Sequence, residues 1–135
     1  MTTDIRLDQP HTVIVAGGAG FIGANFVRNV VSTTNWSVVV VDKLTYAGNL
    51  ANLEGLPGER VDVVAGDICD ENLVNSAASS ADIIVNFAAE SHNDRSLHAA
   101  KSFLKTNVEG TFVCSSCIRL KSKTSARLNR WGICR

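Results

Sequence analysis

The sequence has little of what marks disulfide-rich, membrane-spanning or nucleic-acid-binding proteins. Its four cysteines are too few and too unevenly spread for a disulfide framework, which is typical of a reducing compartment. No apolar run approaches the length of a membrane span, and the charged, proline-containing start lacks the apolar stretch of a signal peptide. The 13 basic and 13 acidic residues cancel, which argues against broad attraction to nucleic acid or anionic membranes. We therefore expect a cytoplasmic protein that binds a small neutral ligand or a local anion.

The 135 residues suffice for one domain with a hydrophobic core and are too few for two ordinary domains. Short apolar runs rich in valine and isoleucine alternate with stretches of helical periodicity. Strands are predicted at 12–16, 37–41, 61–65 and 82–87. The first helix is predicted from Gly20 to about Ser32, with an apolar stripe of Ile22, Phe26, Val27, Val30 and Val31. A second helix is predicted after Asp70 over Leu73, Val74 and Ala77, and a third from about Leu97 or Ala99 to Leu120. One short helix is expected in the loop region between Tyr46 and Gly58. This order predicts an α/β protein, a partial Rossmann fold whose parallel sheet of about four strands has the order 3-2-1-4 with flanking helices.

Three glycines, Gly17, Gly20 and Gly23, stand where the first predicted strand meets the first helix. In a parallel sheet this junction lies at the carboxyl edge, where ligands bind. Gly17 allows a tight turn, Gly20 lets the backbone approach a pyrophosphate, and Gly23 lets the helix pack closely on the strand. The free N–H groups and positive dipole end of the helix then face the phosphates. Glycines also occur in plain tight turns, but the strand before them and the striped helix after them favour a dinucleotide site.

Asp42 ends the second predicted strand. A carboxylate at this position can accept both hydroxyl protons of an adenosine ribose, and it repels the extra phosphate of NADP. NAD is therefore the expected cofactor. Lys43 beside it could offset some of that repulsion, and an aspartate that only ends a strand in a turn is the simpler alternative.

Two longer motifs are more distinctive, DKLTYAGN after the second strand and AAESH-x-DRS after the fourth. Together with AGGAGFIGANFVRNV, GDICD and FLKTNVEGT, they resemble the opening third of the dTDP-glucose 4,6-dehydratases. These enzymes are extended short-chain dehydrogenase/reductases that modify nucleotide sugars. The resemblance covers roughly positions 12 to 113, and the two longer motifs are closer to the dehydratases than to the related epimerases.

The resemblance implies a set of cofactor contacts along the carboxyl edge of the sheet and one contact to a dTDP-sugar. They are Phe21 and Ile22 for the pyrophosphate, Asp42, Lys43, Leu44 and Thr45 for the adenosine ribose, Asp67 and Ile68 for the adenine, Ala88, Ala89 and Thr106 for the nicotinamide end, and Ser91 for the sugar nucleotide. For Asp67, a turn or cap residue ahead of the next helix is the alternative. His92 lies in a polar cluster, where a structural role is favoured over catalysis.

In the family that the chain resembles, hydride leaves the glucose C4 to NAD, water is eliminated across C5 and C6, and hydride returns to C6. The resemblance assigns this chemistry to a Tyr-x-x-x-Lys pair, whose lysine lowers the tyrosine pKa, and to a Thr-Asp-Glu segment. Neither motif occurs here, since Tyr46 is the single tyrosine and Leu50 stands four positions after it. No catalytic residue is therefore assigned. The open alternatives are an enzyme by descent, a non-catalytic dinucleotide-binding module or inert remnant, and a fragment of a related nucleotide-sugar epimerase.

We divide the chain into an N-terminal extension at 1–11, an NAD-binding Rossmann portion at 12–113 and a divergent basic tail at 114–135 that we expect to be poorly ordered. Because the likeness fades after about Val113, a truncated or frame-shifted gene product is our hypothesis. Cys114, Cys117 and Cys134 lack the second pair of a four-ligand zinc set, so no metal site is predicted. A missing fifth strand would leave the fourth as an unpaired edge, which predicts self-association. By resemblance, full-length relatives form homodimers through a helix bundle that includes the helix after the fourth strand.

Overall fold

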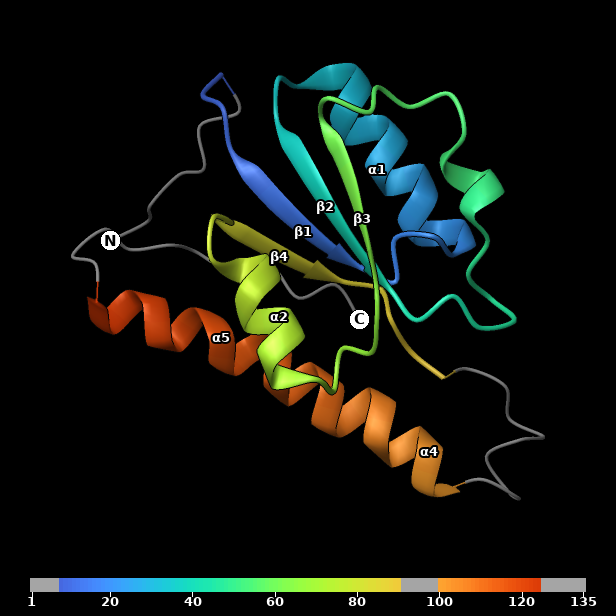
Figure 1. Ribbon diagram of the computed structural model, residues 1–135, viewed down its shortest axis with the longest axis vertical. Helices are drawn as coiled ribbons and strands as arrows, with labels where there is room; N and C mark the ends of the chain where they lie inside the picture. The colour runs from blue at the N-terminus through green and yellow to red at the C-terminus, as the bar shows by residue number, and fades with distance from the viewer. Residues whose placement is uncertain (1–7, 91–99, 125–135) are drawn as a thin grey trace.

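A parallel four-stranded sheet forms the centre of the fold. The computed structural model describes residues 8–90 and 100–124, with side chains described as far as residue 117. The strands are β1 (Thr12–Ala16), β2 (Ser37–Asp42), β3 (Val61–Ala65) and β4 (Ile83–Asn86). They are parallel and stand in the order β3-β2-β1-β4, as Figure 1 shows. The predicted fold class and strand order are confirmed.

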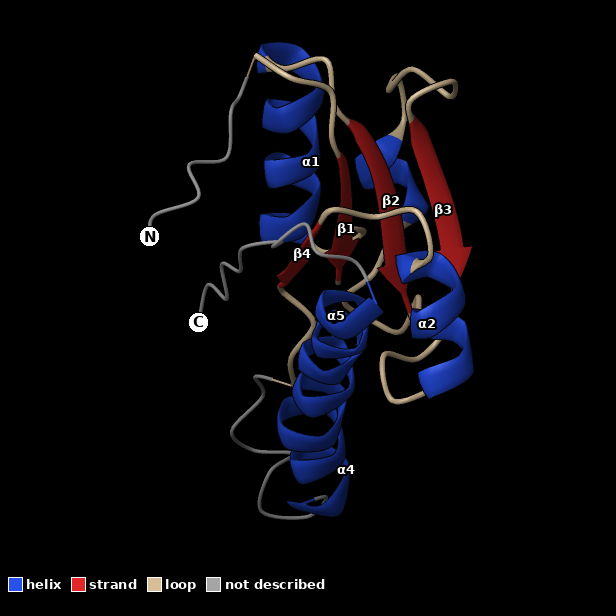
Figure 2. Cartoon of the chain, turned by 90° about the vertical axis from the view of Figure 1, so that its left-hand side faces the viewer, coloured by secondary structure: helices blue, strands red, loops and turns tan. Residues whose placement is uncertain are grey.

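Helices cover both faces of this sheet. They are α1 (Phe21–Thr33), the short 3₁₀ helix η1 (Leu50–Leu53), α2 (Glu71–Ala78), and a continuous helical stretch made of α4 (Ala100–Leu104), the π-helical η2 (Lys105–Gly110) and α5 (Thr111–Thr124). In Figure 2, α1 lies on one side of the sheet, and α2 and α5 lie together on the other. The helix predicted after Asp70 begins there as expected, because the Asp70 carboxylate accepts hydrogen bonds from the backbone N–H groups of Asn72 and Leu73.

The central strand β1 is buried on both faces and is therefore almost wholly apolar, whereas the edge strand β3 carries the exposed Asp62 and Val63. Val13 and Val15 of β1 point into a core formed with α1, whereas Ile14 and Ala16 point into a second core formed with α2 and α5. All four side chains are at most 1% exposed. The consecutive valines of β2 divide between the same two cores. The carboxyl ends of the strands are thereby held rigidly at one edge of the sheet.

The apolar stripe predicted on the first helix is wrong at one position. Ile22 is 67% exposed, and the buried positions of the first turns belong to the small residues Gly23 and Ala24. The reason is the close approach of α1 to the preceding loop, since a Cβ on Gly23 would collide with the carbonyl oxygen of Gly17. Helical periodicity alone does not reveal this contact.

The boundary expected at residue 114 falls inside α5. Cys114 and Cys117 are each 4% exposed and belong to the core on that face of the sheet. They lie one helical turn apart, so both thiols share the buried side of the helix. Residues 125–135 of the expected tail and residues 1–7 of the expected N-terminal extension lie outside the described residues. None of the described helices is long and apolar enough to cross a membrane.

Candidate functional site

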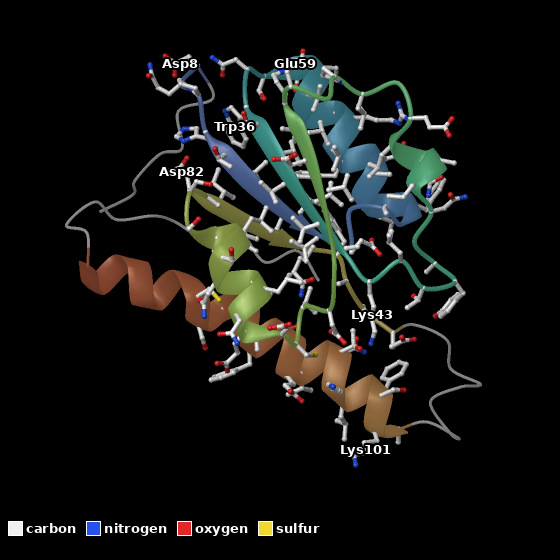
Figure 3. All side chains as sticks on the ribbon, viewed as in Figure 1. Asp8, Trp36, Lys43, Glu59, Asp82 and Lys101 are labelled. Carbon is white, nitrogen blue, oxygen red and sulfur yellow. The ribbon has the colours of Figure 1, made fainter. Side chains whose placement is uncertain are left out.

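A cleft opens at the carboxyl ends of the strands. The empty space between its walls is about 590 Å³, a figure that includes open solvent at its mouth. Figure 3 places Lys43 at this edge of the sheet and places Trp36 and Asp82 at the opposite edge. The residues that line the cleft come from the end of β2, from the loops after all four strands and from η2. They are Gly17, Gly20, Val41, Asp42, Lys43, Thr45, Ala47, Gly48, Gly66, Asp67, Ile68, Phe87, Ala88, Ala89, Glu90 and Thr106.

The glycine-rich loop forms the floor of this cleft. Gly17 has a left-handed φ of 71°, and a Cβ there would lie 2.6 Å from the backbone nitrogen of Ala88. Glycine is therefore required both by the turn and by the contact with the loop after β4. Gly20 is the N-cap of α1, and no side chain caps this helix end. The first N–H groups and the positive end of the helix dipole are thus available to an anion.

The Asp42 carboxylate ties the end of β2 to this loop. One oxygen, Oδ2, accepts a hydrogen bond of 2.9 Å from the Ala19 N–H, and Oδ1 accepts one of 2.8 Å from the Leu44 N–H. The residue is 8% exposed yet lines the cleft. Each oxygen keeps a further lone pair, so the carboxylate can still accept hydrogen bonds from a ligand. Asp42 therefore combines a structural role with a position suited to ligand recognition.

The loop after Asp42 is shaped by this contact. Leu44 has a φ of 53°, a left-handed conformation that costs a residue with a side chain roughly 1–2 kcal/mol. Its N–H is directed at Oδ1 of Asp42 in this conformation. Gly48 passes so close to the same carboxylate that a Cβ there would collide with Oδ1. Backbone strain concentrated beside a cleft is typical of functional sites.

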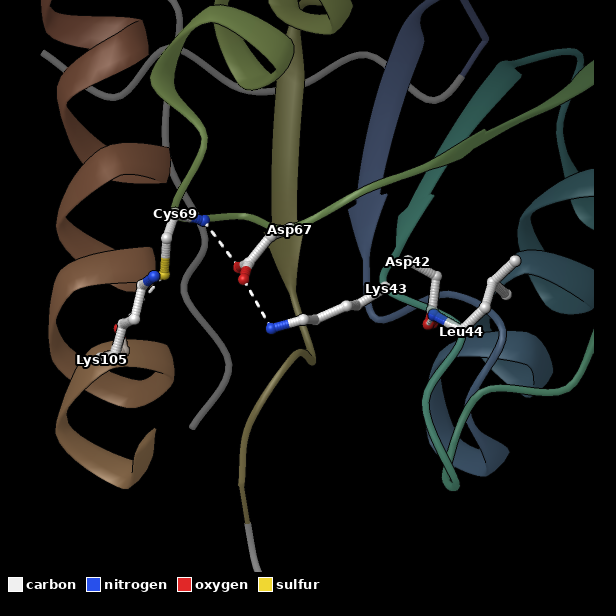
Figure 4. Close-up of polar contacts among 6 residues, drawn as sticks. All are labelled: Asp42, Lys43, Leu44, Asp67, Cys69 and Lys105. Carbon is white, nitrogen blue, oxygen red and sulfur yellow. Dashed lines mark hydrogen bonds and ion pairs between the residues drawn. The ribbon is translucent and has the colours of Figure 1, made fainter. Parts of the chain in front are cut away.

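An ion pair joins the ends of β2 and β3 at one end of the cleft (Figure 4). Lys43 Nζ lies 2.7 Å from Asp67 Oδ2, and Asp67 Oδ1 accepts a 3.0 Å hydrogen bond from the Cys69 N–H. The hydrogen bond to Asp67 holds the pKa of Lys43 above its ordinary value. Burial by itself raises the pKa of Asp67, but the hydrogen bonds from Lys43 and from the Cys69 backbone outweigh it and lower that pKa. Both groups are therefore charged at neutral pH.

The loop after β4 is held in place by η2 and by the loop after β2. The Asn107 side chain accepts a 2.8 Å hydrogen bond from the Glu90 N–H and donates one of 3.0 Å to the Glu90 carbonyl oxygen. The Tyr46 hydroxyl, from the loop after β2, donates a 3.2 Å hydrogen bond to the Glu90 carboxylate. These contacts fix the loop after β4, where Ala88 and Ala89 present only small side chains to the cleft.

Ten of the predicted site residues line one cleft. They are Gly17, Gly20, Asp42, Lys43, Thr45, Asp67, Ile68, Ala88, Ala89 and Thr106. Four others lie beside it. Phe21 and Ile22 are exposed at the start of α1, Gly23 packs under the loop, and Leu44 packs against the core next to α1. Ser91 and His92 lie outside the described residues.

Sequence reasoning missed six residues of the cleft. They are Val41, Ala47, Gly48, Gly66, Phe87 and Glu90. Each of these residues adjoins a residue or motif that the sequence analysis identified. The neighbours of a predicted lining residue at a strand end could therefore have been included in the site. Ala47 and Gly48 lie within the DKLTYAGN motif, Gly66 within GDICD and Glu90 within AAESH.

In the part of the chain that the structure describes, no group of three His, Cys, Asp or Glu side chains is arranged to hold a metal ion. Three thiols lie near one another around α5, Cys69, Cys114 and Cys117. Burial, followed by the neighbouring thiols, raises the pKa of Cys114 to about 12. The Cys69 thiol donates a 3.3 Å hydrogen bond to the Lys105 carbonyl oxygen. Cys114 is therefore a neutral, buried thiol at neutral pH.

The family described as GDP-mannose 4,6 dehydratase matches residues 14–130. The chain belongs to this family. The match extends beyond Val113, the point at which the sequence analysis placed the end of the likeness. The match begins inside β1 and includes the other three strands, the glycine-rich loop and the cleft.

Two curated relatives in this family are strongly similar. The low-salt glycan biosynthesis protein Agl12 of Haloferax volcanii is 54% identical over 102 residues, which are 73% of this chain and 32% of Agl12. The dTDP-glucose 4,6-dehydratase of Streptomyces niveus is 44% identical over 125 residues, which are 88% of this chain and 36% of that enzyme. The chain thus spans about a third of the length of these relatives.

Many solved structures have a similar fold, and one example is also similar in sequence. It is DesIV, the dTDP-glucose 4,6-dehydratase from Streptomyces venezuelae, in a crystal structure with NAD bound. The TM-score is 0.72 and the sequence identity is 45%, over 78% of this chain and 35% of DesIV.

Proposed function

We propose that the chain holds NAD in the cleft and forms the cofactor-binding part of a dTDP-glucose 4,6-dehydratase, which converts dTDP-glucose to dTDP-4-keto-6-deoxyglucose and water. The observation that carries this proposal is the Asp42 carboxylate, which lines the cleft beside the uncapped start of α1. A phosphate-binding helix end next to an acid at the end of the second strand is the arrangement that recognises a dinucleotide. The similarity to DesIV, whose structure contains NAD, supports the same assignment.

The chemistry of the cleft suits each part of this cofactor. The free N–H groups after Gly20 suit the pyrophosphate, and the remaining lone pairs of Asp42 suit the hydroxyls of the adenosine ribose. Ile68 and Asp67 offer an apolar and an accepting surface to the adenine. The small Ala88 and Ala89 leave room for the nicotinamide end. When bound, NAD supplies a reversible hydride acceptor, and the residues of this chain orient it.

Cofactor discrimination follows from the charge on Asp42. Both of its oxygens already accept backbone hydrogen bonds, so the carboxylate cannot turn away from the cleft without breaking them. A phosphate on the adenosine ribose would meet this fixed negative charge. We therefore expect NAD to bind in preference to NADP.

We further propose that these 135 residues, tested by themselves, bind NAD without turning over dTDP-glucose. The sequence contains one tyrosine, Tyr46, and no Tyr-x-x-x-Lys pair. In the structure the Tyr46 hydroxyl is bonded to Glu90, without a lysine four positions along to lower its pKa. This observation favours a dinucleotide-binding module as the second candidate function.

Two measurements on the same protein preparations decide between these functions. Each of three proteins is titrated with NAD in a calorimeter and assayed for dTDP-glucose conversion: the wild type, the test variant Asp42→Asn, and Asp62→Asn as an exposed-carboxylate control. We expect binding by the wild type and the control, weaker binding by Asp42→Asn, and no turnover by any of them. Absence of NAD binding would contradict the cofactor proposal, and turnover would contradict the module.

We also propose that the chain self-associates through the helix after β4. Leu104, Val108 and Phe112 recur every four residues on this helical stretch and are 64%, 61% and 65% exposed. Contiguous exposed apolar side chains are typical of interaction surfaces. Sedimentation velocity tests this: Phe112→Ser should shift the chain toward monomer, whereas Lys101→Gln on the same helix should not. A wild type that is monomeric at all concentrations would contradict the proposal.

A further inference from the structure

Among the described residues, Lys43 is the one lysine that lines the cleft, and it directly follows the acid proposed to face the adenosine ribose. A flexible ammonium group beside that ribose would ordinarily attract the extra phosphate of NADP. In this structure Lys43 Nζ is instead bonded to Asp67 at 2.7 Å. Figure 4 shows the lysine side chain extending from the end of β2 toward Asp67 and away from Asp42.

Asp67 is the better-anchored partner of this pair. Its side chain is 25% exposed, against 59% for Lys43. Its second oxygen is fixed by the Cys69 N–H, so the carboxylate stands at a set position at the end of β3. The carboxylate of Asp67 is therefore the fixed member of the pair, and the long Lys43 side chain extends to reach it. The strand register, which pairs Asp42 with Ala65, places both residues at neighbouring strand ends.

We propose that Asp67 is a specificity-determining residue that maintains the preference for NAD by holding the Lys43 ammonium away from the adenosine ribose. The inference rests on the proposed function and names the residue that prevents Lys43 from undoing the discrimination by Asp42. The raised pKa of Lys43 and the lowered pKa of Asp67 are consistent with a pair that stays charged at neutral pH.

The ratio of NAD to NADP affinity separates this role from any contact that Asp67 makes with adenine. Both cofactors carry the same adenine, so losing such a contact weakens both equally and leaves the ratio unchanged. Release of Lys43 strengthens NADP binding alone. A purely structural role for Asp67 would likewise leave the ratio unchanged.

The test compares wild type, Asp67→Asn and the double variant Lys43→Gln/Asp67→Asn by titration with NAD and with NADP at low ionic strength. Asn keeps a side-chain oxygen for the Cys69 N–H but loses the charge that holds Lys43. We expect Asp67→Asn to lower the NAD-to-NADP affinity ratio by about three- to tenfold. The double variant should return to within about twofold of wild type.

An unchanged ratio in Asp67→Asn would overturn the inference. So would a double variant that keeps the whole change, because the effect would then come from the lost Asp67 charge and not from Lys43. If Asp67→Asn does not fold, Asp67→Ser takes its place in the same comparison, because serine also offers an oxygen to the Cys69 N–H without the charge. An unchanged ratio in that variant overturns the inference. Wild type that binds no NAD would overturn the proposed function itself, and this inference with it.

Discussion

Replacing Asp42 by asparagine tests the double hydrogen bond that joins β2 to the glycine-rich loop. Both carboxylate oxygens accept backbone N–H groups, from Ala19 at 2.9 Å and from Leu44 at 2.8 Å. Asparagine has one acceptor oxygen, so one of these N–H groups would face an amide donor instead. A hydrogen bond to a charged group contributes about 1.5–3 kcal/mol, and a buried donor left unpaired adds to the loss. We expect the free energy of unfolding to fall by about 2–3 kcal/mol.

Urea unfolding of the chain without cofactor measures this loss directly. Against a total stability of about 5–15 kcal/mol, the effect is large, and it corresponds to a Tm lower by roughly 8–12 °C. Asp62→Asn, at an exposed position of β3, is the matched control and should change stability by less than about 0.5 kcal/mol. If Asp42→Asn is as stable as this control, the carboxylate does not hold the loop in the way described.

Three further predictions concern the glycine turn, the ion pair and the buried thiols. Gly17→Ala should destabilise the chain by more than about 2 kcal/mol, because the position has a φ of 71° and a Cβ there would collide with the loop after β4. The control Gly58→Ala, where a Cβ would enter open space, should cost less than about 0.5 kcal/mol. Equal Tm values for the two variants would refute this. The pKa of Asp67 is lowered in the folded chain, so the stability from its pair with Lys43 should be present at neutral pH and lost as pH falls below about 4. The difference in free energy of unfolding between wild type and Asp67→Asn should therefore vanish in acid. A difference that grows there would contradict the pairing. Because its pKa is raised to about 12, Cys114 should react slowly with iodoacetamide at pH 8. Peptide mass spectrometry should show alkylation at least about tenfold slower in the folded chain than in urea. Equal rates would show an accessible thiolate.

The sheet could be predicted from the sequence because each strand is recognised from its own run of apolar residues. A run such as Val38 to Val41 is tolerated only in a strand buried on both faces, and the alternation of such runs with helices leaves few topologies. The third strand, 61–65, was placed at its observed bounds. What failed depends on distant contacts: the exposure of Ile22 follows from the packing of Gly23 on the glycine loop, and the π-helical turn of η2 has no periodic signature.

The same division holds for the cleft. Glycines and an acid at strand ends predict a dinucleotide site, because the carboxyl ends of parallel strands share one edge. The hydrogen bonds of Asp42 could not be predicted, since they depend on the left-handed turn at Leu44. The pairing of Lys43 with Asp67 was within reach, because the predicted strand order already makes the two strand ends neighbours. Conformation within loops, rather than topology, marks the limit of what the sequence discloses here.

We propose above that NAD lies across the carboxyl ends of these strands. Titration of NAD into the isotope-labelled 135-residue chain, followed by backbone amide chemical shifts, tests this claim most directly. The predicted result is saturable change at Gly17, Gly20, Asp42 and Gly48, with the amides of Gly55 and Gly58, which lie outside the cleft lining, unmoved. No saturable change, or change confined to residues away from the cleft, would contradict it.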